Sequence, residues 1–149
     1  MPQLIHRLSA IIASFAALVM LAACGDSPWD DMPDSVATFV DTYFNEGEVE
    51  SATKTSTGFV VTFKNGPQIT FDSQNDWTDI NGRGATLPQM LITDQCPTRV
   101  VDYLKDMELT TEVYRLQRSW HLYTVTLSDS YFTYNNQTDE LTYPEMRQK

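Results

Sequence analysis

The chain repeats one order of hydrophobic patterns, in which a helical stripe is followed by alternating strands. In the first copy, apolar residues in 36–44 recur at the spacing of an amphipathic helix, and Pro33 suits its first turn. The period then changes to two in 59–63 and in 69–72, on either side of the tight turn 65–66. The pattern predicts a helix followed by a β-hairpin.

Two flanking segments extend this hairpin. Residues 48–55 precede it, and residues 76–80, around Trp77, follow it. Both segments have the length of a strand and are bounded by turn residues. We therefore expect a first unit of one helix and four strands over 33–80.

The same unit recurs 64 positions later in the chain. Pro97 and residues 98–107 repeat the proline and the helical stripe at this offset. Residues 122–127 align with the first hairpin strand, and 132–135 align with the second if one deletion is allowed. The alignment predicts a second unit of one helix and four strands over 96–149.

The intervening residues 81–95 are expected to be a linker. Residues 81–84 form a flexible glycine-containing turn, whereas 87–92 are apolar and suit a short helix against the core. Because each unit of roughly 60 residues is too small to be stable alone, we expect the two to share a sheet. The predicted fold is α+β, with up to eight antiparallel strands in one sheet and the helices on one face.

The first 23 residues have the layout of a secretory signal peptide. Residues 1–7 contain a basic residue and no acidic one, and 8–23 are apolar apart from two serines. Residues 21–24 (Leu-Ala-Ala-Cys) resemble the lipobox of bacterial lipoproteins, in which cleavage leaves Cys24 for lipid attachment. A transmembrane helix is the alternative, but about 20 apolar residues are needed to span a bilayer and this run is shorter. We expect a lipid on Cys24 to anchor the protein in a membrane.

Residues 24–32 form an acidic tether after the lipidation site. Asp26, Asp30 and Asp31 resemble the acid-rich segment of outer-membrane lipoproteins in Bacteroides-type bacteria, some of which are surface-exposed. A solvated linker is the alternative interpretation. The expected localisation is the outer membrane, with the protein either periplasmic or surface-exposed.

Charge and the counts of reactive side chains exclude several functions. The 10 Lys and Arg face 20 Asp and Glu, and this net charge of −10 disfavours binding to nucleic-acid phosphates. After removal of 1–23, Cys24, Cys96 and His121 are the cysteines and histidine that remain. These are too few for a zinc cluster or a disulfide framework. We predict a protein that is not an enzyme and that holds no metal and no cofactor.

Two weaker constellations do not change this prediction. Cys96 and His121 offer a nucleophile and a base, but the position of Cys96 at a helix start is more typical of a buried structural thiol. Residues 72–79 carry Asp, Gln, Asp and Asp at the spacing of calcium ligands. However, Trp77 replaces the turn glycine and Arg83 replaces the final glutamate. This excludes an EF-hand and leaves casual cation binding open.

Strand alternation assigns the two faces of the sheet. The residues expected under the helices are Phe59, Val61, Phe63, Ile69, Phe71, Tyr123, Val125, Leu127, Phe132 and Tyr134. The opposite face then carries Trp and Tyr, the residue types that dominate binding hot spots, among threonines. A register slip of one residue would exchange the two faces, and covering of a sheet edge is a second alternative. The candidate partner-binding residues are Val60, Thr62, Trp120, Leu122, Thr124 and Tyr131, and the same face includes Gln68, Thr70, Thr126 and Thr133.

Five segments together form a recognisable pattern: 33–36, 58–63, 69–72 and 76–77 in the first unit, and 123–127 in the second. With the lipobox and the acidic tether, they resemble the PepSY-like, β-lactamase-inhibitor-like lipoproteins of Bacteroides-type bacteria. The resemblance implies tandem repeats whose continuous sheet offers a concave face, which the true inhibitors use to clasp an enzyme. Those inhibitors staple each repeat with a disulfide, whereas this chain keeps one cysteine after lipidation.

Two functions are consistent with these features. The first is a non-catalytic envelope lipoprotein that binds a protein partner, such as an envelope hydrolase that it inhibits, through the exposed sheet face. The alternative is an envelope scaffold or a carrier of a small ligand, a sugar or a peptide. An isolated aromatic patch with a polar rim would favour the first, and a closed pocket between the sheet and residues 87–92 would favour the second.

Overall fold

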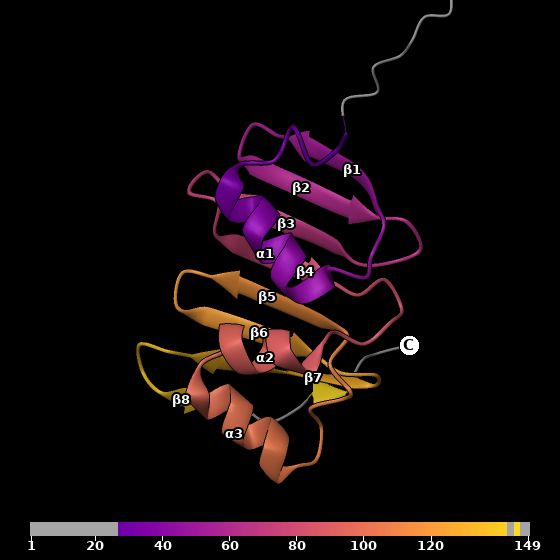
Figure 1. The fold of residues 1–149 in the computed structure, drawn as a ribbon. Coiled ribbons are helices and arrows are strands. Elements are labelled where there is room, and N and C mark those ends of the chain that lie inside the picture. Colours follow the sequence, from indigo (N-terminus) through magenta and orange to yellow (C-terminus); the bar gives the residue numbers. More distant parts are fainter. Residues whose placement is uncertain (1–26, 143–144, 147–149) are drawn as a thin grey trace, which may run out of the picture.

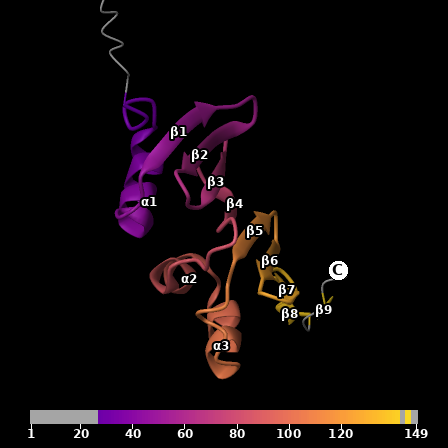
Figure 2. The ribbon, with the colours of Figure 1, turned by 90° about the vertical axis from the view of Figure 1, so that its right-hand side faces the viewer.

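A computed structural model of the chain describes residues 27–142 and 145–146, which form three helices and one sheet (Figure 1). The helices are α1 (Asp34–Phe44), α2 (Gln89–Gln95) and α3 (Thr98–Asp106). Seen from the side, all three lie against the same face of the sheet (Figure 2). The strands are β1 (Val49–Lys54), β2 (Gly58–Phe63), β3 (Gln68–Asp72), β4 (Trp77–Asn81), β5 (Arg115–Ser119), β6 (Leu122–Thr126), β7 (Ser130–Asn135), β8 (Glu140–Leu141) and β9 (Glu145–Met146).

The two longer helices begin in the same way. Pro33 precedes α1 with φ −56° and ψ 144°, and Pro97 precedes α3 with φ −56° and ψ 145°. The proline ring fixes φ and the extended ψ turns the chain into the helix. Each helix then buries one stripe of side chains against the sheet, which confirms the predicted spacing. The stripes are Val36, Val40 and Phe44 in α1, and Val100, Val101 and Leu104 in α3.

The strands lie in the sheet in chain order from β1 to β8, and every pair is antiparallel. β4 of the first unit pairs with β5 of the second through three residue pairs, with Ile80 opposite Leu116 in the middle. The units therefore share one continuous sheet. This confirms the predicted α+β class, with one antiparallel sheet and the helices on one face.

The two edges of the sheet differ. Two short strands share the outer side of β7. β8 pairs with it at Tyr134 and Asn135, and β9 pairs with it at Ser130 and Tyr131. Between them, Thr142 donates its N–H to the Thr133 carbonyl at 2.9 Å. At the opposite edge, no strand within the described ranges pairs with the outer side of β1.

The core runs under the helices through both units. Leu87, Leu91 and Ile92 of the linker enter it and are 4%, 0% and 1% exposed. The short helix predicted in 87–92 is α2, and it starts at Gln89 because Pro88 stands immediately before it. The largest fully buried side chains come from both units and are Phe63, Ile69, Phe71, Ile80, Leu104, Leu116 and Phe132.

Two side chains lie on their predicted faces but differ from the predicted burial. The sequence predicts an exposed Thr126, but this side chain is buried, with 6% exposure. It lies between Arg115 on β5 and Tyr131 on β7, whose longer side chains flank the small threonine on the same face. Tyr123, expected in the core, is half-buried.

The predicted signal peptide, 1–23, and the predicted lipidation site, Cys24, lie outside the described residues. Of the tether, 27–32 are described, and they form turns rather than an extended linker. Met32 is 7% exposed and packs into the core, so the packed part of the first unit begins before Pro33. Among the residues that the structure describes, no helix is long and apolar enough to cross a bilayer.

Candidate functional site

The face of the sheet opposite the helices, called here the open face, is polar and rich in threonine. Side chains point to it at every second position because the strand period is two. Cross-strand pairing places these side chains in continuous rows across both units. The open face comprises Ser51, Thr53, Val60, Thr62, Gln68, Thr70, Asp79, Asn81, Arg115, Gln117, Leu122, Thr124, Thr126, Tyr131 and Thr133.

An ion pair occupies the middle of the open face, where the two units meet. Arg115 Nε donates to Asp79 Oδ1 at 2.9 Å, and its Nη2 donates to Asp79 Oδ2. The hydrogen bond to Asp79 raises the pKa of Arg115. The two side chains are 37% and 26% exposed, so water screens the pair and its stabilisation is about 1 kcal/mol or less. Its bidentate geometry fixes both side chains in place and connects two neighbouring cross-strand rows.

Trp120 lies at the end of the open face and not on a strand. It is in the two-residue turn between β5 and β6, whose strands close with Ser119 opposite Leu122. The side chain is 91% exposed and the backbone has φ 52°. The sequence-based placement of Trp120 on a strand is therefore wrong, because residues 120 and 121 form the turn that joins β5 to β6.

The backbone conformation of Trp120 is energetically unfavourable for a residue with a large side chain. A non-glycine residue with φ near +55° pays about 1–2 kcal/mol, and Asn or Asp tolerates the conformation best. Asn65, Asn75 and Asp139 occupy such positions in other turns of the described chain, and so do the flexible residues Arg83 and Glu108. Trp120 neither packs into the core nor suits its turn, and residues of this kind indicate a function outside the fold.

A hollow of about 680 Å³ lies beside Trp120 on the open face. Its walls are polar, and Leu122 at the start of β6 is 42% exposed near the same turn. Trp120 is a residue type that is enriched in protein-binding hot spots, and Leu122 adds exposed apolar area next to a polar rim. The hollow is lined by Thr70, Asp72, Thr78, Asp79, Gln117, Arg118, Ser119 and Trp120.

The structure brings the six sequence-based candidates together only in part. Leu122 and Thr124 lie on β6, and Tyr131 lies on the neighbouring β7, where it faces Thr126. Val60 and Thr62 lie on β2, separated from β6 by β3, β4 and β5. The candidates therefore share one face but form two groups, one in each unit.

Sequence reasoning missed the residues between these two groups. Asp79, Arg115 and Gln117 join the groups into one surface. β5 was not located because its alternating residues, Arg115 and Gln117 around Leu116, are polar and lack the β-branched or aromatic types of the other strands. The repeat could have located β5, because β1 lies 64 positions before this segment.

The Cys96 and His121 constellation does not form. Cys96 is 9% exposed in the core at the end of α2, and burial raises the pKa of its thiol to about 12. His121 is exposed in the β5–β6 turn, where its Nδ1 is 3.2 Å from Oδ1 of Asn136. The thiol is thus protonated near neutral pH and is not a nucleophile.

The stability of the protein should fall with rising pH because of Cys96. The thiol pKa is raised from its ordinary value of 9.0, so the folded state keeps a proton that the unfolded state loses. The stabilisation is complete below pH 9.0 and is lost as pH rises toward about 12, at up to about 1.4 kcal/mol per pH unit. Urea unfolding at pH 7–11 measures it. Cys96→Ala should show a shallower pH dependence, and parallel profiles would contradict the assignment.

The calcium-like spacing in 72–79 has a structural role. Oδ1 of Asp72 accepts hydrogen bonds from the backbone N–H groups of Gln74 and Asp76, at 2.9 and 3.0 Å, and so closes the β3–β4 turn. Asp79 is committed to Arg115. Within 27–142 and 145–146, no group of three or more His, Cys, Asp and Glu side chains is placed to hold a metal ion.

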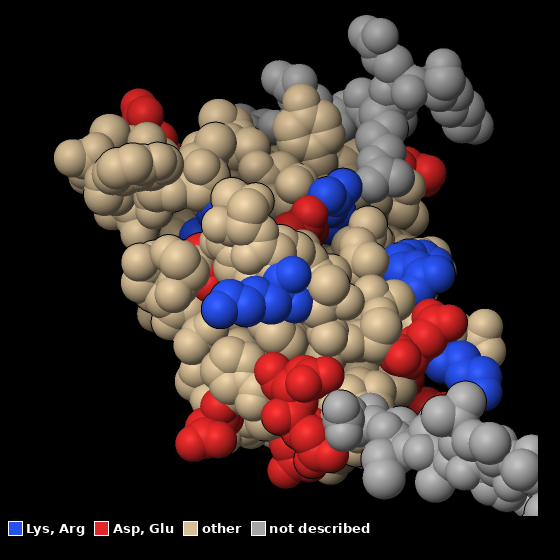
Figure 3. Space-filling model, turned by 90° about the horizontal axis from the view of Figure 1, so that it is seen from above, with Lys and Arg blue, Asp and Glu red and all other residues tan. Residues whose placement is uncertain are grey.

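Charged side chains are mixed on the end of the molecule nearest β1. Figure 3 views this end and shows Lys and Arg interspersed with Asp and Glu. Nucleic-acid binding relies on clustered cations that neutralise successive phosphates. The mixture on this end does not form such a continuous basic surface.

Comparisons with known proteins agree with the tandem architecture. A family described as "Putative beta-lactamase-inhibitor-like, PepSY-like" matches twice, over 26–72 and 57–143. No curated protein matches the chain. Among solved structures, a "putative periplasmic protein" of the DUF2874 family from Bacteroides vulgatus has a TM-score of 0.67 and 21% identity, over 78% of this chain and 92% of its own. A "putative calcium-regulated periplasmic protein" from Bacteroides thetaiotaomicron has a TM-score of 0.65 and 20% identity, over 78% and 92%. A "putative periplasmic protein of unknown function" from Bacteroides vulgatus has a TM-score of 0.63 and 16% identity, over 78% of this chain and 93% of its own.

Proposed function

Because this chain belongs to the PepSY-like, β-lactamase-inhibitor-like family, we propose that it is a non-catalytic envelope lipoprotein that binds a protein partner through its open face. The observation that carries the proposal is Trp120, which is 91% exposed in a turn whose backbone suits Asn or Gly better. A large rigid aromatic side chain gives binding area at little cost in conformational entropy.

The surroundings of Trp120 support a protein partner. Leu122 adds exposed apolar area, while Asp79, Arg115 and Gln117 offer hydrogen-bonding groups in the neighbouring rows. An apolar centre with a polar rim is the usual anatomy of a protein interface. An envelope hydrolase that the protein inhibits is one such partner.

The segment 87–92 gives no support to the alternative function. A closed pocket between the sheet and 87–92 would favour a sugar or peptide carrier, whereas Leu87, Leu91 and Ile92 of this segment pack into the core. The open hollow beside Trp120 suits a surface contact better than the enclosure of a small ligand.

We further propose that a lipid on Cys24 holds the protein at the outer membrane, facing the periplasm or the cell surface. The sequence of 21–24 supports the lipid, and the similar solved structures are periplasmic proteins. A lipid anchor would hold the protein at a membrane without a spanning helix.

The proposal predicts that Trp120→Asn separates binding from stability. The free energy of unfolding should stay unchanged or rise by about 0.5–1 kcal/mol, because Asn tolerates the positive φ. Capture of a specific protein from native envelope extract should fall at least about tenfold, as for a hot-spot residue. Urea unfolding and quantitative mass spectrometry of the captured proteins measure the two effects.

Controls define the site within the open face. Met107→Ala, at the end of α3 and 54% exposed, should leave capture unchanged. Combining Trp120→Ala with Tyr131→Ala tests whether the two aromatic candidate residues act together. If the same proteins are retained by all of these variants, the open face is not the binding surface.

A further inference from the structure

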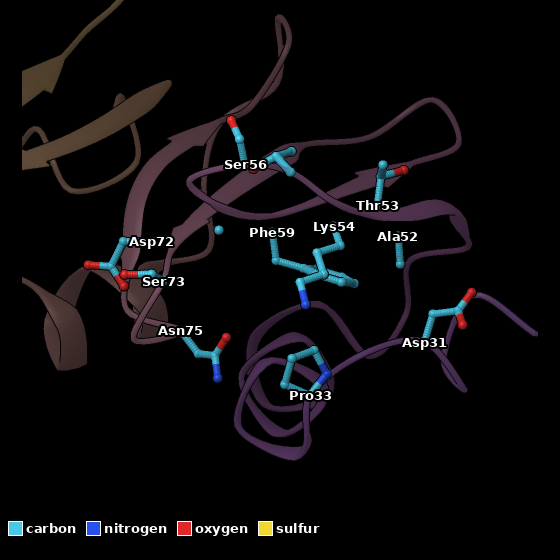
Figure 4. Close-up of a pocket in the computed structure, with 12 residues that line it drawn as sticks. Asp31, Pro33, Ala52, Thr53, Lys54, Ser56, Phe59, Asp72, Ser73 and Asn75 are labelled. Carbon is cyan, nitrogen blue, oxygen red and sulfur yellow. The ribbon is translucent and has the colours of Figure 1, made fainter.

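A second hollow, of about 670 Å³, lies at the other end of the molecule beside β1. Figure 4 shows Lys54 and Phe59 in the middle of this view, with Asp72 and Asn75 on one side and Asp31 on the other. Lys54 of β1 and Phe59 of β2 are cross-strand partners, so the hollow lies on the helix side of the sheet. The hollow belongs to the first unit and shares one lining residue, Asp72, with the hollow beside Trp120.

The second unit contains an equivalent place, and there it is filled. Trp77 at the start of β4 is 3% exposed and donates its indole N–H to Gln95 Oε1 at 3.0 Å. The guanidinium carbon of Arg118 lies 4.7 Å from the centre of the indole ring. The ring of Tyr123 meets it edge-on, with 6.3 Å between centroids. Trp77 belongs to the first unit and is inserted into the second.

The contacts of Trp77 map onto the empty hollow at the repeat offset of 64 positions. α1 and α3 begin at residues 34 and 98, and β2 and β6 begin at 58 and 122, which gives this offset for both helix and sheet. At the same offset, Gln95 corresponds to Asp31, Arg118 to Lys54, and Tyr123 to Phe59. Asp31, Lys54 and Phe59 all line the hollow beside β1.

Each counterpart keeps the chemistry that Trp77 uses. The Asp31 carboxylate accepts a hydrogen bond as the Gln95 amide oxygen does. Lys54 supplies a cation for the face of an aromatic ring, as Arg118 does, and Phe59 supplies an aromatic edge. The hollow therefore has an acceptor, a cation and a ring at the positions that surround an indole in the other unit.

The backbone beside the hollow is available as well. β5 pairs with β4 at positions 115–117, and the same offset gives 51–53 on β1. These β1 residues, Ser51, Ala52 and Thr53, pair regularly with β2 beyond the bulge at Val49. The outer side of β1 meets no strand among the described residues, so its N–H and C=O groups face outward. An extended chain added here would continue the sheet.

We propose that β1 and its hollow bind an extended strand of a partner protein, antiparallel to β1, whose tryptophan inserts against Lys54, Phe59 and Asp31. The occupant copies what β4 and Trp77 do to the second unit. This docking place is distinct from the open face and does not depend on the proposed function.

The chain supplies its own probe for this site. A fluorescein-labelled peptide of residues 75–83, Asn-Asp-Trp-Thr-Asp-Ile-Asn-Gly-Arg, contains β4 and Trp77. Added to the purified protein, it should bind saturably by fluorescence anisotropy. Peptides with Trp77→Ala or Ile80→Pro should bind at least about tenfold more weakly, because the first loses the ring and the second interrupts the strand.

Protein variants locate the peptide. Lys54→Ala and Asp31→Ala change exposed side chains and should weaken binding at least about threefold each without changing the unfolding curve. Trp120→Asn should not change peptide binding, so the outcome is separate from that of the open face. Binding that is absent, or equal for the wild-type and Trp77→Ala peptides, would overturn the proposal. A concentration-dependent dimer that the peptide dissociates would also overturn it, by assigning the hollow to a second copy of the chain.

Discussion

Trp77→Ala should lower the free energy of unfolding by about 3–5 kcal/mol, the range for removing a buried large aromatic side chain. The indole is 3% exposed and connects the two units, since it lies on β4 and packs against Tyr123 and Arg118. Its N–H is also the first member of a hydrogen-bond chain, because Gln95 Nε2 donates in turn to the Tyr43 hydroxyl at 2.8 Å. Removal of the ring leaves a cavity and an unpaired amide oxygen. Chemical unfolding monitored by circular dichroism measures the loss.

Trp77→Phe is the matched control for this effect. It keeps most of the ring and removes the N–H, so it should cost about 1–2 kcal/mol. The two variants together separate packing from hydrogen bonding. A loss below about 1 kcal/mol for Trp77→Ala would mean that the contact between the units does not depend on this side chain.

Gly58→Ala should destabilise the protein by about 3 kcal/mol, because the two strands of the first hairpin approach closely at this residue. A Cβ at Gly58 would lie 1.9 Å from the carbonyl oxygen of Phe71 and 2.6 Å from the carbonyl carbon of Asp72. These are backbone atoms, so the β2–β3 ladder must move, and Gly58 is paired with Asp72 in that ladder. Thermal and urea unfolding measure the effect.

Gly84→Ala provides the comparison for Gly58. Gly84 has φ +95° and no heavy atom within 4 Å of an added Cβ. Alanine there meets backbone strain alone, worth about 1–2 kcal/mol. Equal losses for the two variants would show that contact with Phe71 does not limit the residue at position 58.

Local patterns were sufficient to predict most of the elements. Asn65-Gly66 between two alternating segments indicated the β2–β3 hairpin, and the register observed there places Phe59 opposite Phe71 as one buried pair. The prolines before α1 and α3 marked the helix starts. These features depend on interactions between residues near in sequence, which a periodicity argument captures.

The features that sequence reasoning missed depend on pairing between distant segments. The polar pattern of β5 gives no strand signal, and its place is fixed by pairing with β4 across the whole linker. The division between β8 and β9 follows from where Thr142 meets β7. For the candidate site, the residue types were predicted, but the position of Trp120 depended on which two residues make a turn. That choice is decided by strand register.

The unequal edges of the sheet limit how copies of this protein can associate. Edge-to-edge addition of strands produces endless fibres only if each molecule offers two complementary edges. Here β8, β9 and Thr142 occupy one edge, while the outer side of β1 is unpaired among the described residues. Pairing through β1 joins two molecules and then stops, because within the described residues the opposite edge consists of two-residue strands, which are too short to pair with a further strand. The short C-terminal strands thus prevent the growth of fibres by strand pairing. This suits a protein of repeated units that is expected to be concentrated on a membrane.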